Sequence, residues 1–192
     1  LHGLDLYSLQ ASIGAVIDFL EDRDPEAADE ARELYACFAP WEREPATYGR
    51  IAASGRMRSC ADEVTAVLVE LFHRRRRLMA DGGDELFDAE RNATLVRDAE
   101  RYYRTMYEGS SDAWNLRELH MLDTLEAVLA HGGDEAKIVV WAHDVHVGDA
   151  AGTEMGARQE VSLGGLARRS LGREAVRLVG LGTDRGAVFA AE

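Results

Sequence analysis

The feature that most constrains the fold is a short apolar run, from Ile138 to Ala142, that ends abruptly in polar residues. A continuous apolar run of this length after a glycine pair is typical of a strand that is buried on both faces. A second run of this kind extends from Val176 to Leu181. We therefore predict that the two runs are neighbouring strands of a small, mostly parallel sheet, joined by a right-handed crossover.

A polar cluster follows the first predicted strand. It comprises His143, Asp144, His146 and Asp149, and Gly148 lets the chain turn. Ligands of open α/β sheets bind outside the carboxyl ends of the strands, so this position favours a site. From the residues alone three readings stay open. The histidines and a carboxylate have the donor types of a divalent metal site, or they catalyse a reaction without metal, or they merely hydrogen-bond the loop.

Apolar residues recur at helical spacing over most of the remaining chain, which predicts amphipathic helices. The predicted helices cover residues 6–21, 25–38, 60–79, 84–107, 110–131 and 160–171. Residues 41–59 are predicted to be a connection with a helical turn or two. A turn at 183–186 and a return strand at 187–190 predict a C-terminal hairpin. The predicted fold class is a helix-rich α/β domain that spans residues 1–192.

Composition excludes several classes of partner. The formal net charge is −13, whereas nucleic-acid binding depends on concentrated positive charge. The basic run Arg74–Arg77 is interpreted as a solvated helix face, so we predict no nucleic-acid partner. No apolar run approaches the ~20 residues that span a bilayer, which predicts no membrane partner. Two cysteines, Cys37 and Cys60, and no visible signal peptide predict a reducing cytoplasm.

Several segments of the chain resemble one family, in the same order. They are GLDLYSL, DAERNATLVRDAERYYRTMYEGSSDAWNLRELHM, IVVWAHDVHVGD, TEMG and VGLGTDRG. They look like the erythromycin esterase family, which includes proteins labelled as succinoglycan biosynthesis proteins. The resemblance covers essentially the whole chain. It implies a hydrolase without metal or cofactor, with an α/β core and a large helical portion. The named activity opens a macrolide lactone by attack of water, with a histidine as general base, so the expected partner is a small-molecule ester or lactone.

The resemblance also assigns individual residues. The family's usual central motif is Trp-Ala-His-Asn-x-His, and His143 and His146 match its histidines, whereas Asp144 stands in place of the asparagine. Arg117 matches the arginine of an upstream helix motif. The resemblance implies a catalytic group and a substrate-binding group with no metal ligand: His143, His146 and Arg117 in the first, and Asp144, Asp5 and Met121 in the second.

One part of the family's site has no match in these residues. It is the first active-site segment, a strand and loop with Gly-Glu and a nearby histidine. The chain is therefore interpreted as the C-terminal portion of the family domain, and we expect the missing N-terminal part to supply the general base. The 192 residues alone are expected to be inactive. The alternatives are a metal-binding hydrolase that uses His143 and His146, or a non-catalytic binding or partner module that retains the fold.

Two side chains have alternative interpretations. Arg117 either converges with His143 and His146 on one cleft or extends along the helix into water, as long cationic side chains commonly do. Asp144 either favours the protonated form of the neighbouring histidines through its charge or caps the loop backbone.

Overall fold

The computed structural model describes residues 1–79, 83–107 and 110–182. The chain forms two compact units, Leu1–Lys137 and Ile138–Glu192. The boundary falls just before the first predicted strand, so the apolar run and the polar cluster after it belong to the second unit.

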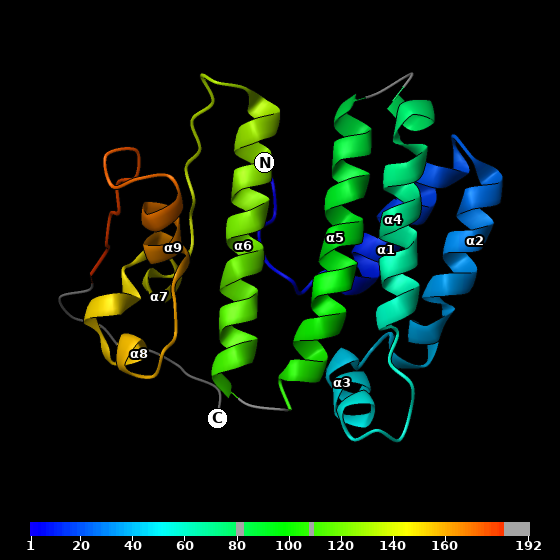
Figure 1. Ribbon diagram of the computed structural model, residues 1–192, viewed down its shortest axis with the longest axis horizontal. Coiled ribbons are helices and arrows are strands. Elements are labelled where there is room, and N and C mark those ends of the chain that lie inside the picture. Colours follow the sequence, from blue (N-terminus) through cyan, green and yellow to red (C-terminus); the bar gives the residue numbers. More distant parts are fainter. Residues whose placement is uncertain (80–82, 108–109, 183–192) are drawn as a thin grey trace. The chain divides into compact units, whose positions relative to one another are not determined.

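The first unit is a bundle of helices (Figure 1). In chain order they are α1 (Leu9–Glu21), α2 (Pro25–Tyr35), the 3-10 helix η1 (Ala36–Trp41), α3 (Pro45–Ala53), α4 (Ala61–Leu78), α5 (Gly83–Thr105) and α6 (Ser110–Gly132). The long helices predicted from the spacing of apolar residues are confirmed, although their ends differ from the predicted ones by a few residues. Local chemistry explains the start of α2, where the Asp24 side chain accepts a hydrogen bond from the Ala27 N–H and Pro25 opens the first turn.

Helix α5 is the centre of the first unit. It contacts α1, α3, α4 and α6, and Figure 1 shows it between α4 and α6. Small residues on α5 are buried, among them Ala89, Ala93 and Ala99, and they let neighbouring helices approach closely. At the crossing with α3, any side chain at Gly49 would overlap the carbonyl oxygen of Tyr103. The two backbones therefore pack in direct contact there.

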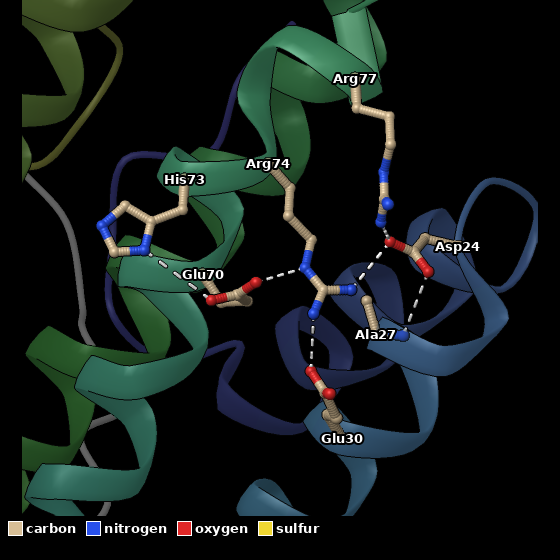
Figure 2. A network of polar contacts seen from close by, with 7 residues as sticks. All are labelled: Asp24, Ala27, Glu30, Glu70, His73, Arg74 and Arg77. Carbon is tan, nitrogen blue, oxygen red and sulfur yellow. Dashed lines mark hydrogen bonds and ion pairs between the residues drawn. The ribbon is translucent and has the colours of Figure 1, made fainter.

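Ion pairs tie α2 to α4 (Figure 2). The Arg74 guanidinium on α4 donates to Asp24 at 2.8 Å and to Glu30 at 3.0 Å, and its Nε donates to Glu70. The Arg74 side chain is only 19% exposed. The interpretation of the basic run as a solvated face is therefore wrong for Arg74, because a half-buried guanidinium bound to three carboxylates is part of the helix interface.

A disulfide links Cys37 of η1 to Cys60, the residue before α4, with 6.1 Å between their Cα atoms. It closes a loop that contains α3. Disulfides persist mainly in oxidising compartments, so this bond gives the predicted reducing cytoplasm no support, and the compartment stays a prediction. Among the described residues, no helix has both the length and the apolar character that crossing a membrane requires.

The described part of the second unit contains short helices and extended segments. The helices are α7 (Asp144–Val147), the 3-10 helix η3 (Ala150–Gly152), α8 (Glu154–Ala157) and α9 (Leu163–Ser170), and α9 confirms the helix predicted over 160–171. Ser162 holds the loop after α7 in place. Its hydroxyl donates to the Gly148 carbonyl at 2.9 Å and accepts from the Ala150 N–H at 3.0 Å. A side chain at Gly164 would overlap the Val147 carbonyl, so α7 and α9 touch through backbone.

The predicted sheet is wrong. Neither residues 138–142 nor residues 176–181 form a strand, and the structure contains no strand within 1–79, 83–107 and 110–182. Val139 is 90% exposed and Trp141 86% exposed. A strand obtains its backbone hydrogen bonds from a neighbouring strand, and these runs have no such neighbour in the described chain. The return strand of the predicted hairpin, residues 187–190, lies outside the described residues. The described architecture is helical instead of α/β.

Candidate functional site

Arg117 on α6 is held by a bidentate ion pair. Its Nε donates to Asp5 Oδ1 at 2.8 Å and its Nη2 donates to Asp5 Oδ2 at 2.6 Å. The guanidinium also lies over two aromatic rings, 4.8 Å from the centroid of Tyr7 and 5.9 Å from that of Trp114. The Arg117 side chain is only 16% exposed. It therefore does not extend into bulk water, and the first unit itself fixes its orientation.

This environment makes Arg117 a permanent, oriented cation. The hydrogen bond with Asp5 raises the pKa of the guanidinium further, against the opposing effect of burial. Because Nε and Nη2 are occupied by Asp5, Nη1 is the donor left over, and it makes no hydrogen bond with the described residues. Asp5 thus contacts Arg117 directly. Its predicted contact with substrate stays a prediction.

Met121 lies one helical turn after Arg117 on the same face of α6. It is buried, with 4% of its surface exposed. A methionine that contacts an apolar substrate and one that only packs in the core would both be buried. The predicted role of Met121 in substrate binding therefore stays a prediction.

His143 is the residue that caps the start of α7, and its ring makes two contacts that cannot be satisfied in the same protonation state. Its Nδ1 accepts a hydrogen bond from the Val145 N–H at 3.2 Å and lies 2.7 Å from Asp144 Oδ1. A neutral ring with a lone pair on Nδ1 can cap the helix, whereas a ring protonated at Nδ1 can donate to the carboxylate. The side chains of His143 and Asp144 are 72% and 64% exposed. His146 lies within α7 and is partly exposed.

Asp149 caps the next element rather than joining the histidines. It accepts a hydrogen bond from the Ala151 N–H at 3.2 Å and lies 3.7 Å from Arg173. Over the described ranges, no three or more His, Cys, Asp or Glu side chains are arranged to hold a metal ion. The metal-binding alternative therefore has no assembled ligand set in this part of the chain.

The predicted site residues thus fall into two groups. Arg117, Asp5 and Met121 belong to the first unit, and His143, Asp144 and His146 belong to the second. Within each group the residues lie close together. The convergence of Arg117 with the two histidines on one cleft stays a prediction.

The structure also contains a buried pair that the sequence analysis missed. His120 of α6, which is 4% exposed, contacts Asp98 of α5 through Nδ1 and Oδ2 at 2.8 Å. Burial alone would raise the pKa of the Asp98 carboxyl, but the hydrogen bond with His120 and the nearby Arg97 outweigh this effect and lower it. No sequence signal indicated the pair, because its members lie on different helices. His120 and Asp5 line the same cavity of about 230 Å³.

Comparison with known protein families matches residues 1–192 to the family described as erythromycin esterase. The match extends over all of the segments that carried the resemblance. No solved structure matches the chain.

Proposed function

Because the chain belongs to the erythromycin esterase family, we propose that it is a hydrolase of carboxylic esters or lactones that uses a histidine-activated water. Membership supports a hydrolase function in general. The finer proposal is that Arg117, His143 and His146 act on one substrate. The observation that carries it is the ion pair of Arg117 with Asp5, because this contact orients a half-buried cation and leaves one end of it available.

Ester hydrolysis places negative charge on the carbonyl oxygen in the transition state, and oriented donors stabilise that charge. A guanidinium fixed by a carboxylate and two aromatic rings requires little reorganisation when the charge develops. We assign Arg117 the role of binding the oxyanion or another anionic group of the substrate through Nη1. Asp5 is then a positioning residue, since it holds Nε and Nη2.

The two histidines supply the proton chemistry in this proposal. Histidine changes protonation near neutral pH, so one ring can accept or donate a proton under physiological conditions. His143 and His146 donate hydrogen bonds or orient the general base that the family resemblance assigns to a Gly-Glu and histidine segment. The exposure of His143 supports a role in contact with a ligand.

The test is hydrolysis of an aryl ester and a macrolide lactone by the natural protein. We expect His143→Asn, His146→Asn and Arg117→Gln each to lower kcat by about 100-fold or more, the magnitude typical of a lost oxyanion donor. The matched control is His73→Asn, because His73 is a 72% exposed histidine on α4. It should leave kcat unchanged.

Asp5→Asn separates positioning from direct contact. If Asp5 acts only through Arg117, the variant should lower kcat and leave the KM of an uncharged ester nearly unchanged. Full activity of the three site variants would contradict the assignment, and binding of the lactone without turnover by the natural protein would favour the non-catalytic module.

A further inference from the structure

Tyr7, in the segment before α1, is an exposed tyrosine that three contacts hold in one orientation. The Arg117 guanidinium lies over its ring, with 4.8 Å between Cζ and the ring centroid. The ring also packs edge to face against Tyr102 of α5, with 6.1 Å between the two centroids, and the two hydroxyls share a hydrogen bond at 3.2 Å. Tyr7 is nevertheless 57% exposed. Fixing an exposed ring costs side-chain entropy, which a tyrosine that only faces water would not lose.

The hydrogen bond between the two hydroxyls has a preferred direction. A tyrosine hydroxyl donates one hydrogen and can also accept. Tyr102 is only 7% exposed, and burial raises the pKa of its hydroxyl, which therefore keeps its proton at neutral pH. If Tyr7 were the donor, the Tyr102 hydrogen would be buried without an acceptor among the described residues, which is costly. Tyr102 therefore donates to Tyr7, and the exposed hydroxyl of Tyr7 keeps its own hydrogen for another acceptor.

This free hydrogen belongs to a ring that contacts the cation of the candidate site. Asp5 occupies Nε and Nη2 of Arg117, so that Nη1 is the remaining donor of the guanidinium. Asp5 also balances the charge of Arg117, and the Tyr7 hydroxyl adds none. Two donors with little net charge complement an oxygen that is neutral in the bound substrate and becomes negative during the reaction. The carbonyl oxygen of an ester is an oxygen of this kind.

We propose that Tyr7 is a substrate-contact residue whose hydroxyl donates a hydrogen bond to the carbonyl oxygen of the bound ester, beside Arg117. Tyr102 is then a positioning residue, because it acts on the substrate only through Tyr7. The inference rests on the proposed hydrolase function and adds a second donor to the same site.

Two conservative substitutions remove one hydroxyl each. Tyr7→Phe keeps the ring beneath Arg117, and Tyr102→Phe removes the group that orients the Tyr7 hydroxyl. With the natural protein and phenyl acetate as substrate, we expect Tyr7→Phe to lower kcat/KM by about tenfold, as for the loss of one hydrogen bond. Tyr102→Phe should lower it by about threefold, since the donor is kept but is no longer fixed. The matched control is Tyr107→Phe, at another exposed tyrosine, and it should leave kcat/KM unchanged.

The double variant Tyr7→Phe/Tyr102→Phe separates substrate contact from support of the fold. Tyr7→Phe alone leaves the buried Tyr102 hydroxyl without its acceptor and should lower the Tm, whereas removal of both hydroxyls should restore most of the Tm. We expect kcat/KM of the double variant to stay at the level of Tyr7→Phe. If kcat/KM recovered together with the Tm, Tyr7 would only support the fold and the proposal would be overturned.

Binding of phenyl methylphosphonate gives a readout without turnover, because this stable anion has the shape of the tetrahedral intermediate of phenyl acetate hydrolysis. Isothermal titration calorimetry should show binding to the wild-type protein and a Kd about tenfold higher for Tyr7→Phe. No binding to the wild type, or a Kd and kcat/KM that Tyr7→Phe leaves unchanged, would overturn the inference. If Tyr7→Phe weakened phosphonate binding but the wild type did not hydrolyse phenyl acetate, the hydrolase proposal would fail and the contact role of Tyr7 would stand.

Discussion

The packed helices of the first unit and the extended runs of the second unit differ in how far their apolar side chains are buried. In the first unit, large apolar residues such as Leu71 and Val64 are at most 2% exposed and pack among the helices. In the second unit, Val139, Val179 and Leu181 are 73% to 90% exposed. The residue types are alike, so hydrophobicity does not explain the difference. A helix satisfies its backbone hydrogen bonds internally, whereas an extended run depends on a neighbour to do so.

The same contrast applies to two histidine–aspartate pairs. His120 and Asp98 in the first unit lie 2.8 Å apart, and His143 and Asp144 in the second lie 2.7 Å apart. The side chains of the first pair are 3% and 17% exposed, and those of the second are 72% and 64% exposed. Water screens the second pair and not the first. We therefore expect the two pairs to differ in energy although their distances are nearly the same.

The largest expected effect compares one buried and one exposed leucine. Leu71→Ala should lower the free energy of unfolding by about 4 kcal/mol, because it removes buried methyl groups and leaves a cavity. Leu181→Ala should change it by less than about 0.5 kcal/mol, as for an exposed position. Urea denaturation followed by circular dichroism measures both. If the two substitutions lowered the free energy of unfolding by similar amounts, the comparison would fail. Such a result would mean that the run over 176–181 is buried in the folded protein.

Removal of the disulfide should have a slightly smaller effect on stability, and this effect should be confined to the first unit. Replacing both Cys37 and Cys60 by serine should lower the free energy of unfolding by about 3 kcal/mol, the value that chain entropy gives for a loop of this length. The two cysteines lie 23 positions apart in the sequence. Amide exchange should increase around η1 and α4 and stay unchanged in α9. Thiol labelling of the purified wild-type protein provides the control, because two reactive thiols would show that the bond is absent.

The smallest effect sharpens the comparison of the two histidine–aspartate pairs. Because the pKa of Asp98 is lowered in the folded protein, its charge adds stability above the unfolded value of about 4, and this is lost as pH falls through the lower folded value. Asp98→Asn should therefore cost about 1 kcal/mol at pH 7, and the difference from wild type should shrink below about pH 4.

Asp144→Asn is the matched control for that measurement. It should change the free energy of unfolding by less than about 0.5 kcal/mol at every pH, because the pair with His143 is exposed. Urea denaturation of both variants between pH 3 and pH 8 distinguishes them. Parallel pH dependence of the two variants would contradict the inference that burial, rather than distance, sets the energy of these pairs.

The sequence by itself determined mostly local features of the fold. The helical spacing of apolar residues located the long helices of the first unit, and the Asp24-Pro25 pair located the start of α2. Both signals arise between residues that are close in the chain, so they do not depend on the rest of the fold. The segments shared with the erythromycin esterase family likewise identified the family, and the family match confirmed it.

Only the tertiary structure decided which distant residues meet. Asp5 and Arg117 are separated by 112 positions, and Asp98 and His120 by 22. Their contacts depend on how α5, α6 and the segment before α1 pack, which no periodicity encodes. The predicted sheet failed for the same reason. An apolar run such as residues 138–142 indicates that a segment is suited to a buried strand, but a strand exists only where another segment supplies the matching hydrogen bonds.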